Sequence, residues 1–323
     1  MSDLAEYARR LHESERRSYP RRLNPLRLES ARDTLRGVRA VIADVYGTMV
    51  NYWRPGFERR DSREALLLEA FSGVVDRFGM GETLAAMNPA ETPAETLCGF
   101  YNGLLAMGRE KSAGGGNALR EARVEEVWSV IALMLKRNGY DAAASPWRGA
   151  PEDFARCLAY TYNFLSMGRE LYPGVSGALK KLKDGNIALG ILSDAQFYTP
   201  VDLTLMLRDQ SGGRIADCGE LFDPDLTFLS CEYGFVKPSE ALYRRLFDAL
   251  YEYHITPDQT VIVGNDLAAD VAPAAALGMR TALFCGDDLM AFGRDAGGGA
   301  VPDIVFCDWA ELPERLLFHG EPE

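Results

Sequence analysis

The second half of the chain alternates short apolar runs with segments of helical periodicity. The apolar runs cover residues 187–192, 226–229, 260–263, 281–284 and 304–306, and an earlier one covers 38–43. Runs of this length that are rich in β-branched residues are typical of buried parallel strands. Helical patterns lie between them, at about 173–183, 239–253 and 268–277. Strands that alternate with helices predict an α/β fold with a doubly wound parallel sheet as its core.

Residues 55–170 show the period of helices almost throughout. Apolar side chains between Val124 and Leu135 recur at steps of three and four residues, which marks one face of an amphipathic helix. The glycine-rich segment 112–116 interrupts the pattern and predicts a loop. Because this block follows a single strand, we expect an all-helical domain inserted into the core. The first 37 residues, rich in Arg and Glu, are expected to form a helical arm that packs on the core or makes a dimer contact.

These patterns predict three parts: an N-terminal helical arm at 1–37, a core domain formed by 38–54 and 171–323, and a helical domain at 55–170. The chain has 323 residues, which is enough for about two domains of ~100–200 residues. Four polar clusters follow predicted strands of the core. In a parallel sheet, ligands bind beyond the carboxyl ends of the strands. The clusters are Asp44–Thr48, Ser193-Asp194, Lys237-Pro238, and Gly264-Asn265-Asp266 with Asp270 one turn further on.

Any one of these clusters is compatible with a turn or a helix N-cap. Together they predict a catalytic site. Asp44 can attack phosphorus or carbon and form a covalent intermediate. Mg²⁺ would offset the repulsion between Asp44 and an anionic substrate, with Asp266 and Asp270 as further ligands. Ser193 offers a hydroxyl donor to a phosphoryl oxygen, and Lys237 offers a positive charge. Asp194 either faces the substrate or caps a helix.

The amino-acid composition limits the classes of partner that we expect the protein to bind. The formal net charge of -12 disfavours nucleic acid and anionic membrane surfaces, and a small anionic substrate would need local positive charge. None of the six cysteines forms a C-x-x-C pair, so we expect reduced thiols and a cytoplasmic protein. The polar N-terminus is unlike a signal peptide, and no apolar run approaches the ~18 residues of a membrane span. A monomer or a homodimer fits equally well.

Over residues 38–320 the ordered motifs resemble those of the haloacid dehalogenase-like (HAD) superfamily. The resemblance implies a Rossmann-like core, a helical cap inserted between the first two motifs, and Asp44 as the nucleophile. It makes Asp44, Tyr46, Thr48, Ser193 and Lys237 the catalytic candidates, with Ser193, Asp194 and Lys237 at the substrate. It also implies a metal site. The metal ligands would be Asp44, the backbone carbonyl of Tyr46, Asp266 and Asp270.

Two motifs point to different reactions. Magnesium-dependent phosphatases of the superfamily carry an acid/base aspartate where this chain has Tyr46. The Asp-x-Tyr-Gly-Thr form resembles the metal-independent L-2-haloacid dehalogenases, whose halide leaving group needs no proton. The fourth motif resembles the magnesium-binding form instead. Either Asn265 or Asp266 fills its main ligand position, and Asp266 is favoured because carboxylates bind Mg²⁺ better.

Three functions therefore stay open. The first is Mg²⁺-dependent hydrolysis of a small phosphorylated metabolite. The second is metal-independent carbon–halogen or related C–X hydrolysis, with water activated by Asp270 or Asp266. The third is a catalytically weak HAD fold used for binding, which an intact Asp44 and Lys237 make less attractive.

Overall fold

The computed structural model describes residues 3–15, 18–19, 21–112, 121–144, 149–290 and 300–318. The chain divides into two compact units. A helical unit comprises Met1–Tyr19 with Tyr52–Arg169, and a sheet unit comprises Pro20–Asn51 with Glu170–Glu323. The division into arm, core and cap at 1–37, 38–54 with 171–323, and 55–170 stays a prediction.

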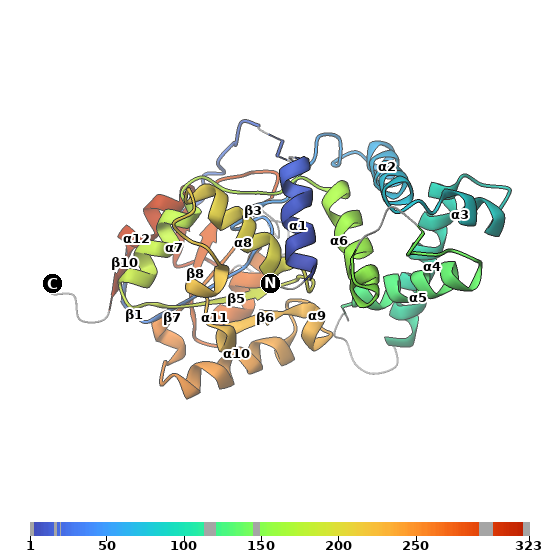
Figure 1. The fold of residues 1–323 in the computed structure, drawn as a ribbon. Helices are drawn as coiled ribbons and strands as arrows, with labels where there is room; N and C mark the ends of the chain where they lie inside the picture. The colour runs from blue at the N-terminus through green and yellow to red at the C-terminus, as the bar shows by residue number, and fades with distance from the viewer. Residues whose placement is uncertain are drawn as a thin grey trace. The chain divides into compact units, whose positions relative to one another are not determined.

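Six parallel strands form the centre of the sheet unit, in the order β6-β5-β2-β7-β8-β9 (Figure 1). They are β2 (Ala40–Ala43), β5 (Ala188–Ser193), β6 (Thr227–Leu229), β7 (Thr260–Gly264), β8 (Arg280–Phe284) and β9 (Ile304–Phe306). The predicted Rossmann-like parallel sheet is confirmed, and each strand overlaps a run named from the sequence. β2 lies between β5 and β7, where Ile42 pairs with Gly190 on one side and Ile262 on the other.

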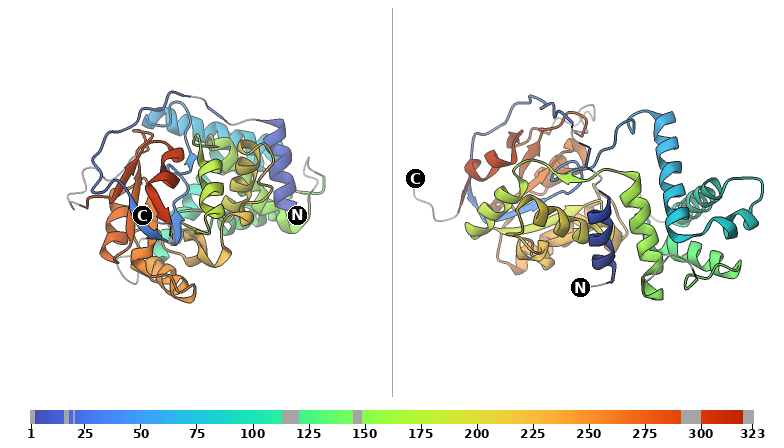
Figure 2. Two further views of the ribbon diagram at one scale, coloured as in Figure 1. Left: turned by 90° about the vertical axis from the view of Figure 1, so that its left-hand side faces the viewer. Right: turned by 45° about the horizontal axis from the view of Figure 1, so that its top comes forward.

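Helices cover both faces of this sheet (Figure 2). α7 (Val175–Asp184) and α8 (Thr199–Gln210) lie on one face, and α10 (Glu240–Glu252) and α11 (Ala272–Ala276) on the other. The leucines of α10 recur at four-residue steps and pack against the sheet in one buried core cluster, which also contains Ile42 and Ile262. The unit also contains the short helices α9 (Ser230–Tyr233) and α12 (Leu312–Arg315).

Two small strand pairs complete the sheet unit. β1 (Leu35–Val38) pairs in parallel with β10 (Leu316–Phe318), and β3 (Val50–Asn51) pairs antiparallel with β4 (Glu170–Leu171). The β3–β4 pair joins the segment after the first motif to the segment that returns the chain to the sheet.

The expected helix through residue 37 is wrong beyond Ser14. Among the described residues of this segment only α1 (Asp3–Ser14) is helical, and those from 21 to 34 contain no helix. Some of their backbone donors bond along the edge of the sheet instead: Leu26 donates to the carbonyl of Cys285, just after β8, and Arg32 to that of Asp303, just before β9. Pairing with the end of β8 and the start of β9 satisfies peptide groups that a helix would otherwise have satisfied internally.

The helical unit matches the helical block expected from its periodicity. Besides α1 it contains α2 (Arg60–Phe78), α3 (Gly81–Met87), α4 (Pro93–Ser112), α5 (Val124–Arg137) and α6 (Phe154–Ser166). Aromatic rings fill its interior, where Phe71 stacks on Tyr162 and both contact Trp128. The predicted loop at 112–116 lies mostly outside the described residues. No helix of the described chain is both long and apolar enough to span a membrane.

The close packing of β5 against its neighbours can be tested at Gly190. A Cβ at this position in β5 would collide with the Leu226 carbonyl oxygen and the Ile42 side chain. Gly190→Ala should therefore destabilise the protein by about 1–3 kcal/mol, measured by urea unfolding. Gly177→Ala is the matched control, because the exposed Gly177 in α7 has open space around a Cβ. It should change stability by no more than about 1 kcal/mol, in the stabilising direction. Equal effects would contradict the close approach.

Candidate active site

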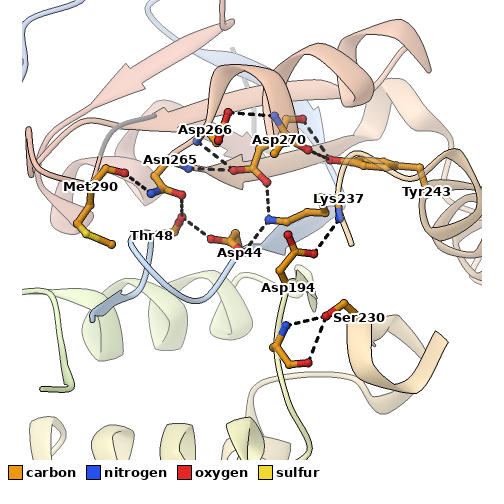
Figure 3. Close-up of polar contacts among 12 residues, drawn as sticks. Asp44, Thr48, Asp194, Ser230, Lys237, Tyr243, Asn265, Asp266, Asp270 and Met290 are labelled. Atoms are coloured by element: carbon orange, nitrogen blue, oxygen red, sulfur yellow. Dashed lines mark hydrogen bonds and ion pairs between the residues drawn. The ribbon is translucent and has the colours of Figure 1, made fainter. Parts of the chain in front are cut away.

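The parallel sheet brings the predicted clusters to one edge. Asp44 follows β2, Ser193 ends β5 and Gly264 ends β7, and these three strands are direct neighbours in the sheet. Lys237 reaches the same place from the loop between α9 and α10. Figure 3 shows the resulting network of polar side chains.

Lys237 is the centre of this network. Its Nζ lies 2.7 Å from Asp44 Oδ1 and 2.6 Å from Asp270 Oδ1. All three side chains are almost inaccessible to solvent, at 4%, 7% and 2% for Lys237, Asp44 and Asp270. A buried ammonium group between two carboxylates leaves the trio with one net negative charge when all three are ionised.

The pKa shifts reflect this crowding. Burial would lower the pKa of Lys237, but the charges of Asp270 and Asp44 outweigh it and raise the pKa well above its usual value. Burial is also the largest influence on Asp270. Together with the charge of Asp44 it raises the pKa of Asp270 to about 6, against the opposing effect of Lys237. Lys237 therefore stays charged, while Asp270 takes up a proton more readily than an ordinary aspartate does.

Backbone groups fix Asp270 from the other side. Its Oδ2 accepts from the N–H groups of Asn265, at 3.2 Å, and Asp266, at 3.1 Å. The predicted helix at 268–277 begins as a π-helical turn, Leu267–Val271, before α11. The hydroxyl of Tyr243 donates to the Ala269 carbonyl in this turn, at 2.8 Å. Sequence reasoning missed Tyr243, because its position in α10 is that of an ordinary core residue.

Thr48 and Asn265 continue the network on the far side of Asp44. Thr48 Oγ1 lies 3.0 Å from Asp44 Oδ2 and 3.2 Å from Asn265 Oδ1, and Asn265 Nδ2 donates to the Met290 carbonyl. Gly47 has a φ of 86°, and a Cβ there would collide with the Asn265 side chain. Only glycine allows this turn and this approach together. Trp309, also missed, holds the turn by donating Nε1 to the Thr48 carbonyl, at 2.9 Å.

Asn265 and Asp266 point in different directions. The Asp266 carboxylate caps the π-helical turn, where Oδ1 accepts from Ala268 N at 2.7 Å and Ala269 N at 3.0 Å. The Asn265 side chain instead joins Thr48, beside Asp44. The residue that faces the first motif is thus Asn265, although Asp266 was the favoured ligand from the sequence.

The remaining candidates lie around Asp44 and Lys237. Asp194 Oδ1 accepts from the backbone N–H of Lys237 at 2.8 Å. Ser193 is fully buried, and its Oγ has no hydrogen-bond partner among the described residues. The Tyr46 hydroxyl lies 2.9 Å from Thr199 Oγ1, at the start of α8. The structure therefore gathers the predicted residues at one edge of the sheet, where the Asp266 carboxylate caps the turn instead of joining the hydrogen bonds around Asp44.

Comparison with known families agrees with this geometry. A family model described as HAD-hydrolase-like matches residues 235–287, the segment that carries Lys237, Asn265 and Asp270. This match confirms the resemblance to the HAD-like hydrolases. With it, the expectation that the chain is a hydrolase is confirmed. The comparison with curated proteins gave no match.

Solved structures of two kinds resemble this chain. A HAD phosphatase from Thermococcus onnurineus is 18% identical over 86% of this chain and 97% of its own, with a TM-score of 0.45. A 2-haloacid dehalogenase from Pseudomonas syringae is 20% identical over 86% and 97%, with a TM-score of 0.48. Likeness at this level does not decide between phosphoryl and carbon–halogen chemistry.

Removing Lys237 should cost stability. Lys237→Met leaves Asp44 and Asp270 buried without their shared cation, which should lower the free energy of unfolding by about 3–5 kcal/mol. The raised pKa of Asp270 sets the pH dependence, because the folded state holds its proton at about pH 5 and releases it at about pH 8. The loss should therefore be larger at the higher pH, as urea unfolding at both values would show.

Lys180→Met is the matched control for this substitution. Lys180 makes an exposed ion pair with Asp184 in α7, and removing such a pair should change stability by less than about 1 kcal/mol at either pH. A loss for Lys237→Met that does not exceed the control would contradict the buried charge balance.

Proposed function

We propose that the chain hydrolyses a small phosphorylated metabolite through a covalent intermediate on Asp44, with Mg²⁺ as its cofactor. One observation carries the proposal: the site has more carboxylates than its lysine can balance. Asp44 and Asp270 share the ammonium group of Lys237. Burial raises the pKa of Asp194, and the charges of the nearby Asp44 and Asp266 add to that shift. An anionic substrate approaching these four aspartates would be repelled unless a further cation joined them.

Asp44 is placed to act as the nucleophile. Lys237 and Thr48 each hold one oxygen of its carboxylate, which fixes the orientation of the group. A carboxylate oxygen carries two lone pairs, so each can accept one hydrogen bond and still present electrons to phosphorus. Fixing the attacking group in advance lowers the entropy cost of reaching the transition state.

Ser193 is placed to hold the substrate. A buried hydroxyl without a partner costs about 1–3 kcal/mol in lost hydration, and a phosphoryl oxygen would supply the partner. Ser193 is the last residue of β5, and Asp44 directly follows the neighbouring strand β2. The two residues therefore lie at the same edge of the sheet. We infer that Ser193 Oγ donates to an oxygen of the substrate.

The donor set suits Mg²⁺, although no group of three His, Cys, Asp or Glu side chains in the described chain is arranged as a metal cage. Mg²⁺ binds through one or two carboxylates and completes its shell with water and substrate oxygens. Asp44, the Tyr46 carbonyl and Asp270 would hold it. The amide oxygen of Asn265 would take the place of Asp266, whose carboxylate caps a turn. When bound, the ion neutralises charge and polarises the phosphoryl oxygens.

Tyr46 favours a second candidate, metal-independent C–X hydrolysis. The side chain two residues after Asp44 is a phenol that contacts Thr199, not a carboxyl. Displacement of halide from carbon by Asp44 needs no proton donor, so this site could support it unchanged. The surplus of carboxylates weighs against it, because a haloacid is itself an anion.

Hydrolysis of para-nitrophenyl phosphate with Mg²⁺, and with a chelator, tests the two candidates. We expect turnover that requires Mg²⁺ and falls to background in Asp44→Asn, because the amide is a far weaker nucleophile than the carboxylate. Asp184→Asn, at the exposed end of α7, is the matched control and should keep full activity.

Turnover that is unchanged in chelator would contradict the magnesium proposal. Release of halide from a short L-2-haloacid in chelator, dependent on Asp44, would replace it with C–X hydrolysis.

A further inference from the structure

Phosphate ester hydrolysis leaves one role unfilled in this site. The departing alkoxide needs a proton, and positioned acid catalysis is worth about 10²–10⁴-fold in rate. Tyr46 is poorly suited to supply it, since an ordinary tyrosine has a pKa of about 10 and this hydroxyl is bound to Thr199 at the start of α8. Another acid near Asp44 must act, or the enzyme is limited to good leaving groups.

Asp194 is held close to the contact between Lys237 and Asp44. Its Oδ1 accepts from the backbone N–H of Lys237, the residue whose Nζ contacts Asp44 (Figure 3). The backbone on either side is fixed as well. Ser193 ends β5, and both the N–H and the carbonyl of Ala195 bond to the buried hydroxyl of Ser230, at 2.9 and 3.3 Å. Unlike Asp44 and Asp270, Asp194 is exposed, so an incoming substrate can reach it.

The groups that face Asp194 come from three elements. Lys237 lies in the loop before α10, Asp44 follows β2 and Asp266 follows β7. Partial burial of the carboxyl is the largest cause of its raised pKa, and the charges of Asp44 and Asp266 add to it. Lys237 opposes the shift through its charge and its backbone N–H. The net effect is a pKa above the usual value, so the Asp194 carboxyl holds a proton more readily than an ordinary aspartate does.

We propose that Asp194 is the general acid and base of the reaction, in the role that Tyr46 leaves open; this inference rests on the proposed phosphohydrolase function. Asp44 attacks phosphorus, the bond from phosphorus to the leaving oxygen breaks, and that oxygen takes the proton of the Asp194 carboxyl. In the second half, water attacks the phosphorus of the aspartyl phosphate and gives a proton to the Asp194 carboxylate. Phosphate leaves, and both aspartates return to their starting states.

The dependence on the leaving group tests this assignment. Asp194→Asn keeps an oxygen for the Lys237 N–H but has no acidic proton to transfer to the leaving oxygen. It should lower kcat for glycerol phosphate, whose alkoxide needs a proton, by about 10²–10⁴-fold. It should lower kcat for para-nitrophenyl phosphate, whose phenolate leaves unaided, by less than about tenfold. The wild-type rate on glycerol phosphate should fall as pH rises through deprotonation of the acid, and the variant should lack this limb.

Asp194→Glu is the second variant, and it should recover part of the glycerol phosphate activity because it restores an acid. Thermal unfolding of both variants should match the wild type. Equal losses on the two esters, or a rise in KM with kcat unchanged, would overturn the assignment and leave Asp194 a structural or binding residue. A wild type active on neither ester would instead contradict the phosphohydrolase proposal, and this inference with it.

Discussion

The balance of charge around Lys237 is the constraint on which this site depends. Two buried carboxylates from different segments of the chain can lie close together only if a cation lies between them, since an unpaired buried charge costs several kcal/mol. Lys237 supplies that cation to Asp44 and Asp270 at once. The lysine therefore links the segment that follows β2 to the turn that follows β7. Fold and chemistry rely on the same contact.

The positive charge of Lys237 does not balance all the carboxylates of the site, because Asp194 and Asp266 add negative charge at the same edge of the sheet. A site with surplus carboxylates is suited to a divalent cation and, through it, to an anionic substrate. Burial raises the pKa of Asp194 and of Asp270, and the charges of neighbouring carboxylates add to each shift. A carboxyl group with a raised pKa is better able to hold and donate a proton. The surplus of negative charge thus favours the proposed cofactor and, together with burial, the proposed acid.

Close backbone contacts make the arrangement rigid. Gly47 allows the turn after Asp44 to lie against Asn265, and Trp309 and Tyr243 each hold a backbone carbonyl beside the site. These residues come from segments far apart in the chain, and the two aromatic side chains bond to backbone carbonyls. Their effect is to hold Asp44, Thr48 and Asp270 in place before substrate arrives, which is how a protein lowers the cost of reorganisation during catalysis.

The parallel sheet, its strands and the edge that carries the site could be predicted from the sequence, because apolar runs and the polar residues that follow them are local features. Asp44, Ser193 and Lys237 could be named on the same ground.

The tertiary structure alone decided that Asn265 faces Asp44 while Asp266 caps a turn. The direction of these side chains depends on a π-helical turn that the periodicity of the sequence does not reveal. It also decided that residues 21–34 follow the sheet instead of forming a helix. The contact of Asp194 with Lys237 likewise joins residues 43 positions apart, a pairing that arises only when the strands assemble.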